Sequence, residues 1–590
     1  MGLPWETAMA KYRIESRRSS LVPQSEAAWV LLAVAVVWFA LFFQLGELPL
    51  LQPDEGRNAE VAREMKESGA WLSPTYDGIT YLDKPAFYFK TVALSLAAFG
   101  NNETAARLPS ALFGLATLAL VYGFCRRVYG ARCAVMAVII IATMPLYVLL
   151  SRTVIFDIAL AFFVVAAIFA GYWAEECDGK SRRIWYLLGA LAAGFATLVK
   201  GPVGFLIPGL VLFVFHRVEG RRGVWKRFFA PLNLLGFFGV TLPWFVGLSL
   251  QHPDFPYYGL IEESFHRFTT TTFHRSQPFY FYALIVAGLF LPWSLILPEA
   301  IVAAWKRKSP LASADRLFLV WAVVVVIFFS LSKSKLPGYI LTVSVACGIL
   351  VARFFQQAMA NPGGKAARIT YRASVTQAVL CFVVAAAAIY LSPRMNSLAR
   401  PLKLSVADAN ELGRHFITPV IVLSVFGVAG LLARFRRDAG LCFASFAIFP
   451  VLLFTLNLGV IQAVFNIKSA RLLAQQIPPL PPETELVFLE CFPNGLPFYL
   501  NRTATLLTRD GGEITSSSNY ILFCLKKETN WPTNLVPVAE FDHWLAGRQN
   551  QVYLLARSSD RARLEDVAEI QETNIQQLTP LYVGVLVPAP

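Results

Sequence analysis

Residues 53–90 read PDEGRNAEVAREMKESGAWLSPTYDGITYLDKPAFYFK and form the first long polar interval in a chain of 590 residues that is otherwise mostly apolar. Acidic and basic side chains gather there: Asp54, Glu55 and Arg57 lie near its start, and Asp83 and Lys84 near its end. The interval directly follows an apolar segment. Charges collected at this point indicate a site at a membrane surface.

The composition around this interval is that of a membrane protein. Hydrophobic residues make up 56% of the chain and charged residues 15%, and the mean hydropathy is +0.53. A soluble protein carries about 25% charged residues. The net charge of +14 resides mostly in short loops between apolar blocks, where Lys and Arg act as topology signals. This distribution argues against nucleic acid as a partner.

The apolar residues come in thirteen blocks of roughly 17–22 residues, about the length of a helix that crosses a bilayer. The blocks are 27–45, 107–125, 132–150, 155–173, 184–199, 202–217, 229–249, 279–297, 315–331, 336–355, 374–391, 416–434 and 440–459. Residues 86–99 are also apolar, but they are fewer and include Lys90. We expect them to form an interfacial helix that does not cross.

The charges of the loops predict the orientation. With the N-terminus in the cytoplasm and thirteen crossings, all the basic loops fall on the cytoplasmic side, as the positive-inside rule requires. These loops include residues 126–132, 180–183, 217–227, 306–308, 353–372 and 434–437. Counting 86–99 as a crossing would invert every later loop. The polar interval then faces the outside.

Two domains follow from this topology. Residues 1–459 are expected to form a polytopic all-α membrane domain whose first outer loop spans 46–106 with interfacial helices. Residues 460–590 are expected to form a small extracytoplasmic α/β domain. Its expected strands are LVFLE (486–490), FYLN (498–501), NYILFCL (519–525) and QVYLLAR (551–557). A disulfide between Cys491 and Cys524 in this domain is left open.

The predicted topology places further charged residues on the outer side. They are Asp157 in SRTVIFD, Lys200 in LVKGP, Glu262, Glu263, His266 and Arg267 in the loop after the block 229–249, and Lys333 and Lys335 in SKSKLPGY. A carboxylate such as Asp157 at the edge of an apolar segment is costly and is a functional candidate. The outer lysines run against the charge bias of the other loops, which indicates that they bind an anion.

Each of these residues also has a purely structural interpretation. Lys200 could end a helix with its ammonium on the last carbonyl groups. The DEGRNAEVAREM run could be an amphipathic surface helix with Asp54 or Glu55 at its N-terminus. His266 could be an ordinary interfacial histidine. Their shared side of the membrane favours a joint function.

Sugar transfer from a polyprenyl phosphate needs this combination of groups. Cations stabilise the phosphate as it leaves the anomeric carbon, and Arg and Lys both suit that contact. A carboxylate removes the proton of the acceptor. We therefore expect Asp54 to be the base. The expected phosphate ligands are Arg57, Lys84, Lys200 and Lys335.

Several stretches, in order along the chain, resemble bacterial lipid-phosphate-sugar glycosyltransferases of the GT-C fold. The resemblance is to the aminoarabinose transferases that modify lipid A and to the wider dolichyl-phosphate-mannose-protein mannosyltransferase superfamily. The stretches are 53–90, AARLPSALFG (105–114), SRTVIFD (151–157), LVKGP (198–202), FHRF (265–268), KLPGYIL (335–341) and SARLLAQQI (469–477). The resemblance implies a GT-C type membrane domain.

The resemblance also implies roles for individual residues. Asp54 would be the catalytic carboxylate and Asp157 its partner. Asp83 and His266 match positions that bind a divalent cation in some members, so Zn, Mg or Mn is a candidate cofactor, and no nucleotide cofactor is expected. The residues that would hold the donor phosphate are Arg57, Lys84, Lys200 and Tyr339.

The expected function is a glycosyltransferase of the bacterial inner membrane with its active site facing the periplasm. Its donor would be a sugar on undecaprenyl phosphate, and its acceptor lipid A, another glycolipid or a protein. The alternative is a transporter or flippase for an anionic lipid-linked substrate. Transporters usually show repeated halves and charges at mid-membrane, and this sequence shows neither.

Overall fold

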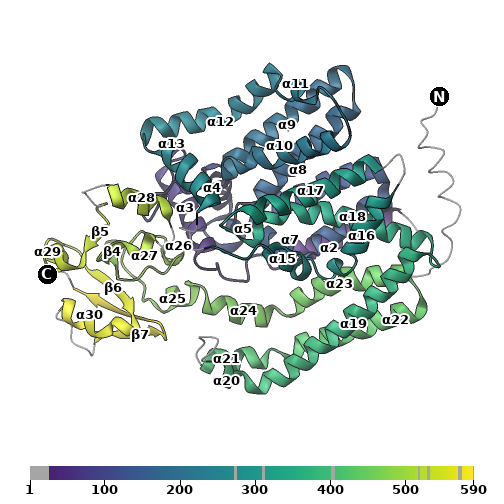
Figure 1. Ribbon diagram of the computed structural model, residues 1–590. Coiled ribbons are helices and arrows are strands. Elements are labelled where there is room, and N and C mark those ends of the chain that lie inside the picture. Colours follow the sequence, from purple (N-terminus) through teal and green to yellow (C-terminus); the bar gives the residue numbers. More distant parts are fainter. Residues whose placement is uncertain are drawn as a thin grey trace.

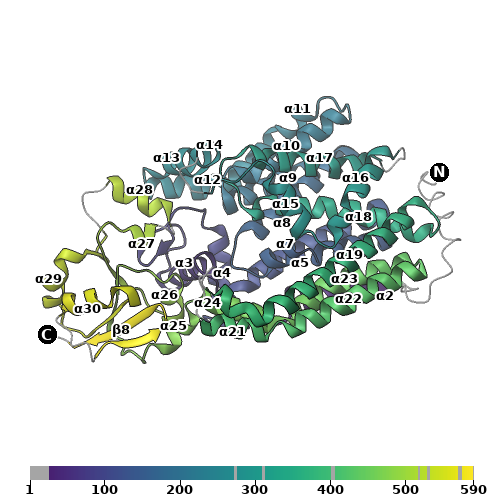
Figure 2. The ribbon, with the colours of Figure 1, turned by 60° about the horizontal axis from the view of Figure 1, so that its bottom comes forward.

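A computed structural model describes residues 26–270, 275–307, 312–399, 406–515, 518–527, 532–568 and 574–588. Long helices pack side by side in one body, and a sheet with its own helices lies at one end of them (Figure 1). The first outer loop, with α3 and α4, lies between these two parts in both views (Figure 2).

The long helices coincide with the apolar blocks of the sequence. In the first half of the chain the helices are α2 (Glu26–Leu41), α5 (Glu103–Tyr129), α6 (Ala131–Ala142), α7 (Pro145–Ser151), α8 (Asp157–Glu176), α9 (Gly179–Lys200), α10 (Val203–Val218), α11 (Val224–Phe228) and α12 (Pro231–Gln251). The helices α6 and α7 are bent by 71°. Pro145 lies at the first turn of α7, where its missing N–H and fixed φ suit the start of a new helix.

The second half of the membrane domain continues in the same way. Its helices are α15 (Phe281–Leu289), η2 (Trp293–Leu295), α16 (Leu297–Lys306), α17 (Ala312–Leu331), η3 (Pro337–Ile340), α18 (Leu341–Ala360), α19 (Lys365–Leu391), η4 (Ser392–Arg394), α20 (Met395–Leu398), α21 (Val406–Arg414), α22 (Ile417–Arg436), α23 (Ala439–Leu456) and α24 (Leu458–Ile467). Many of their large apolar side chains are exposed, as expected where the solvent is lipid.

The predicted polytopic all-α domain is confirmed, and most of the thirteen expected crossings have the length and hydropathy of a membrane span. In the described residues, nine helices are long and apolar enough to cross a membrane, or ten if the bent pair α6 and α7 is one span. The blocks 27–45 and 202–217 form the shorter helices α2 and α10. The block 279–297 is divided among α15, η2 and α16, with Pro292 and Pro298 at the breaks. These three crossings stay predictions.

The first outer loop folds into a helix, a small hairpin and a second helix. They are α3 (Asp54–Ser68), β1 (Thr75–Tyr76), β2 (Ile79–Thr80) and α4 (Phe87–Phe99). Asp77 and Gly78 connect the two strands with positive φ angles of 54° and 74°, as a two-residue hairpin turn requires. Glu64 on α3 accepts hydrogen bonds from Thr75 and from both turn amides. With 13 residues, α4 is a short apolar helix.

The C-terminal part contains a six-stranded mixed sheet with the strand order β5-β4-β3-β6-β8-β7. Strands β3, β4, β5 and β6 pair in parallel, while β8 runs antiparallel to β6 and β7. The strands are β3 (Glu485–Leu489), β4 (Thr505–Thr508), β5 (Leu535–Pro537), β6 (Val552–Arg557), β7 (Gln576–Thr579) and β8 (Tyr582–Val587). The predicted small α/β domain is confirmed.

Helices connect these strands, and two of them replace predicted strands. They are α25 (Arg471–Gln476), α26 (Leu496–Leu500), α27 (Gly512–Thr515), α28 (Asn519–Lys527), η5 (Val538–Glu540), α29 (Phe541–Ala546), η6 (Ser558–Asp560) and α30 (Arg561–Ala568). The predictions of strands in FYLN and NYILFCL were wrong. Short apolar runs do not distinguish a strand from a buried helix, and here the run 519–525 is held as a helix by contacts with the first outer loop. Cys491 and Cys524 are not joined by a disulfide.

The sheet packs one face against the first outer loop. Along β3, Leu486 and Phe488 join an apolar cluster that contains Tyr76 of the loop, while Val487 and Leu489 pack in a separate cluster on the opposite face. This alternation follows from the two-residue period of a strand. The C-terminal sheet is thus a support for the loop that carries the candidate site.

Candidate functional site

Asp54 begins α3 and forms an ion pair with Arg57 one turn later. The Nη2 of Arg57 donates to Oδ1 of Asp54 at 2.6 Å, and the Asp54 side chain remains 49% exposed. Burial would raise the pKa of Asp54, but the charges of Arg57, Arg275 and Arg267 outweigh it, so the pKa lies below its usual value. Asp54 is therefore an ionised, accessible carboxylate, as a base requires.

Glu55, the next residue, is buried and holds the loop to the membrane domain. Its carboxylate accepts two hydrogen bonds from Arg107 on α5, both at 2.9 Å. It also accepts from the amides of Leu51 and Val154. The same Arg107 donates to the carbonyl groups of three residues that precede α3, namely Leu45, Leu48 and Pro49. The interpretation of DEGRNAEVAREM as a surface helix with a carboxylate at its N-terminus is therefore wrong, because α3 is mostly buried and has no side-chain cap. Asp54 is left available.

The Lys84 ammonium donates hydrogen bonds to two acceptors, a backbone carbonyl and a carboxylate. Its ammonium donates to the backbone carbonyl of Asp83 at 2.6 Å and to the carboxylate of Glu263. Glu263 lies in the π-helix η1 (Tyr258–His266), which sits between α13 (Phe255–Tyr257) and α14 (Arg267–Thr269) in the loop after α12. The same Oε1 atom of Glu263 also accepts from Arg267.

Asp157 and Lys200 form the second part of the site. Asp157 begins α8 and Lys200 ends α9, and their side chains meet with 2.5 Å between Nζ and Oδ1. The Lys200 ammonium also lies over the ring of Tyr339, 4.5 Å from its centroid. Gly338 packs directly against the Asp157 carboxyl, where an added Cβ would lie 3.1 Å from Cγ. A side chain at position 338 would therefore crowd the Asp157 carboxyl.

The two parts meet at the ring of Phe156. The ammonium of Lys84 lies 5.7 Å from its centroid and that of Lys200 lies 5.1 Å from it. Arg267 joins these groups through its ion pair with Glu263. Burial would lower the pKa of Arg267, but Glu263 and Tyr339 raise it. We call these three cations, Lys84, Lys200 and Arg267, together with their carboxylates Glu263 and Asp157, the cation cluster. Cations placed around one apolar ring can hold a phosphate at an apolar surface.

Lys335 takes a different position from the one predicted. Its ammonium donates to the carbonyl of Ser332 at 2.5 Å, and its side chain is buried in its own loop. Among the described contacts, none joins this ammonium to the cation cluster. Its loop is nevertheless close, since Tyr339 follows four residues later. Lys335 as a phosphate ligand stays a prediction.

The predicted cation ligands Asp83 and His266 have other partners. Asp83 accepts from Tyr258 at 2.6 Å and from the amides of Asn519 and Tyr520, at the start of α28. His266 pairs with Glu262 at 3.1 Å. In the described parts of the chain no group of three or more His, Cys, Asp or Glu side chains is arranged to hold a metal. The oxygens of Asp83 are thus already engaged, and the set does not fit a cation.

Three residues at this site have no role predicted from the sequence: Phe156, whose ring borders the cation cluster, and Glu263 and Arg267, which are predicted only to lie on the outer side with the other charged residues. Arg267 lies in the FHRF stretch and Phe156 in SRTVIFD, next to residues that were singled out. Their neighbourhood was therefore visible in the sequence. Their contacts were not, because Lys84 and Glu263 are 179 residues apart.

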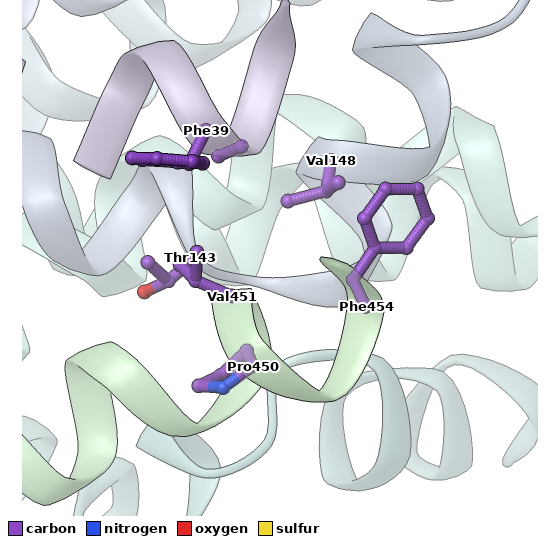
Figure 3. Close-up of a pocket in the computed structure, with 7 residues that line it drawn as sticks. Phe39, Thr143, Val148, Pro450, Val451 and Phe454 are labelled. Atoms are coloured by element: carbon purple, nitrogen blue, oxygen red, sulfur yellow. The ribbon is translucent and has the colours of Figure 1, made fainter. Parts of the chain in front are cut away.

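A separate pocket lies between α2, the α6–α7 bend and α23. Figure 3 shows Phe39, Val148 and Phe454 around it, with Thr143, Pro450 and Val451 completing the lining. No charged side chain lines it. The pocket therefore does not fit a sugar phosphate, and the cation cluster remains the candidate site.

Known proteins resemble this chain in sequence and in fold. The family model described as dolichyl-phosphate-mannose-protein mannosyltransferase matches residues 83–246. The chain is 28% identical over 536 residues to the undecaprenyl phosphate-alpha-4-amino-4-deoxy-L-arabinose arabinosyl transferase of Edwardsiella ictaluri (strain 93-146), covering 89% of this chain and 92% of that protein. A protein of the same description from Proteus mirabilis (strain HI4320) is 32% identical over 336 residues, which is 56% of this chain and 60% of the relative.

A solved structure is similar along nearly the whole chain. It is the crystal structure of ArnT from Cupriavidus metallidurans bound to undecaprenyl phosphate, with a TM-score of 0.80 and 28% identity, covering 95% of this chain and 98% of that one. The predicted resemblance to GT-C glycosyltransferases of the aminoarabinose transferase type is confirmed. The prediction of a multi-pass membrane protein is confirmed as well.

Proposed function

We propose that this chain is an integral-membrane glycosyltransferase that moves a sugar from undecaprenyl phosphate to an acceptor on the outer side of the membrane. The enzyme class predicted from the sequence is confirmed by relatives that are named arabinosyl transferases. One observation carries the mechanism: Lys84 and Lys200, from distant parts of the chain, both face the Phe156 ring. Two positive charges beside one apolar ring support the binding of a lipid phosphate there.

The reaction assigns one task to each group. Asp54 takes the proton of the acceptor hydroxyl as its oxygen forms a bond to the anomeric carbon. The bond between that carbon and the phosphate oxygen breaks, and undecaprenyl phosphate leaves with one more negative charge. Lys84 and Lys200 stabilise that charge, and preformed cations are effective there because they need no rearrangement.

Asp157 and the remaining ligands position these groups. Asp157 holds the Lys200 ammonium at 2.5 Å and Tyr339 supports the same ammonium from its ring face. Arg57 keeps Asp54 ionised. Lys335 is a further ligand if its loop rearranges when the donor binds. A divalent cation enters no step.

The acceptor and the membrane are proposed on two grounds. The relatives' donor is named as undecaprenyl phosphate-linked aminoarabinose, and a sugar of that class with lipid A as acceptor fits the same site. The basic loops support a cytoplasmic N-terminus and a cation cluster at the periplasmic face of a bacterial inner membrane.

The test is sugar transfer by the purified full chain in lipid nanodiscs. It is supplied with undecaprenyl phosphate-linked aminoarabinose and lipid A, and mass spectrometry follows the mass of lipid A. We expect the mass of one sugar to be added by the wild type and not by Asp54→Asn, which should still bind undecaprenyl phosphate. Movement of the lipid across liposomes without sugar transfer would favour a flippase instead.

The matched control is Glu67→Gln. Glu67 lies on the same helix, is 46% exposed and also pairs with an arginine, Arg63, one turn away. We expect this variant to transfer sugar at the wild-type rate. Equal losses in both variants would remove Asp54 from the chemistry.

A further inference from the structure

Both carboxylates of the cation cluster, Asp157 and Glu263, pair with a lysine that would bind the phosphate in the proposed reaction. Asp157 takes Lys200, and one oxygen of Glu263 takes both Lys84 and Arg267. A phosphate group and these carboxylates therefore compete for the same donors. The question is which carboxylate gives way when the donor lipid arrives.

Glu263 is poorly satisfied where it lies. Its Oε1 accepts from two cations, while its Oε2 is buried and accepts no hydrogen bond. The side chain is only 10% exposed. A buried acceptor without a partner costs about 1–3 kcal/mol. Only one of the two carboxylate oxygens of Glu263 is thus hydrogen-bonded within the described residues.

A nearby anion is required to keep the buried Lys84 ammonium protonated. Burial lowers the pKa of its ammonium, and the nearby charge of Glu263 opposes that effect. Removing Glu263 without a replacement would leave Lys84 and Arg267 buried, positive and close together, which is unfavourable. A phosphate, with more oxygens and an equal or greater charge, can replace the carboxylate on both cations at once.

The backbone that carries Glu263 differs from its surroundings. Residues Tyr258–His266 form a π-helix of nine residues, a rare conformation that is frequent at functional sites. This segment contacts α28 of the C-terminal domain, and its first residue donates to Asp83, the neighbour of Lys84. Glu263 therefore lies on an irregular element that adjoins the site directly.

We infer that Glu263 is a stand-in for the donor phosphate: it pairs with Lys84 and Arg267 before the donor binds and is displaced when undecaprenyl phosphate binds. The inference rests on the proposed function, because it needs the phosphate to bind these cations. Glu263 then sets the affinity for the lipid, and it prevents the cations from trapping the product, which carries more charge than the donor.

The test is the affinity of the full chain in nanodiscs for undecaprenyl phosphate. If Glu263 occupies the site most of the time, its neutral replacement Glu263→Gln should bind about tenfold more tightly, because apparent affinity is reduced by the fraction of competent protein. The gain should shrink when Lys84→Met is added. Glu262→Gln, one residue away on the same helix and paired with His266, is the matched control with unchanged affinity.

Unchanged or weaker binding by Glu263→Gln would overturn the inference, since Glu263 would then only position Lys84 and Arg267. If this variant does not fold, Glu263→Asp keeps the charge but is too short to bridge both cations, and it should bind with intermediate affinity. The ligand-induced rise in Tm reports folding and binding together. A wild type that binds no undecaprenyl phosphate would overturn the proposed function itself, a result distinct from both.

Discussion

Asp54 and Glu55 are neighbours at the start of α3, yet their side chains lie in different surroundings, one accessible and the other buried. Glu55 is 1% exposed and its carboxylate accepts four hydrogen bonds, two of them from Arg107. Asp54 is half exposed and has one ion-pair partner, Arg57. The first carboxylate anchors the loop, and the second is left accessible.

The difference shows how a rigid site is built on a loop. A carboxylate whose oxygens are all engaged cannot serve as a base, but it fixes the helix on which the base sits. A site holds its geometry when such a support surrounds it. Asp83 and Lys84 show the same difference between an anchoring residue and a site residue. Asp83 anchors the loop to α28, while the adjacent Lys84 pairs with Glu263.

The largest effect is expected from breaking the anchor. Glu55→Gln leaves the guanidinium of Arg107 buried without its counter-charge, and breaking a buried ion pair costs about 3–5 kcal/mol. We expect a matching loss in the free energy of unfolding, measured by denaturant titration in detergent. Asp54→Asn should change stability little. A similar loss in both variants would contradict the distinction between anchor and base.

The next effect concerns the cation cluster. Lys200→Met removes one charge that stabilises the leaving phosphate, and loss of one such group lowers kcat by about a hundredfold. The rate of sugar transfer in nanodiscs measures this. Lys90→Met, on α4 and outside the described contacts of the cluster, should keep the wild-type rate. A change in KM alone for Lys200→Met would assign Lys200 to donor binding only.

Asp83→Asn tests the second anchor and the metal prediction together. Replacing an acceptor of two amides at the start of α28 should lower stability by about 1–2 kcal/mol, as for other helix caps. Transfer by the wild type should survive removal of divalent cations with EDTA. Loss of activity on chelation, restored by Zn, Mg or Mn, would instead support the cation predicted at Asp83 and His266.

The smallest effect is the pH dependence of the exposed carboxylate. The folded pKa of Asp54 lies below the ordinary 3.8, so its contribution to stability is complete above the unfolded pKa and is lost as the pH falls through the folded value. The base is therefore ionised throughout the physiological range. We expect kcat/KM to show no acid limb from Asp54 between about pH 5 and pH 8. An acid limb within that range in the wild type that moves to higher pH in Arg57→Gln would contradict this assignment.

Much of the site was predictable residue by residue. Asp54, Asp157, Lys84, Lys200 and Tyr339 were singled out, and the structure brings the last four to one ring or one ion pair. Lys335 and Asp83 were singled out too, but their polar atoms have local or structural partners. A sequence shows that a charge is unusual in its place. It does not show which neighbour satisfies it.

The sequence by itself determined that the chain is a polytopic helical membrane protein with a C-terminal α/β part and a charged interval after its first apolar block. Length of apolar runs and charge bias are local properties, so they can be read along the chain. Only the tertiary structure decided that the run 519–525 is a helix against Asp83 and that Glu263 meets Lys84. These outcomes depend on packing between residues far apart in the chain, and such packing overrides local preference.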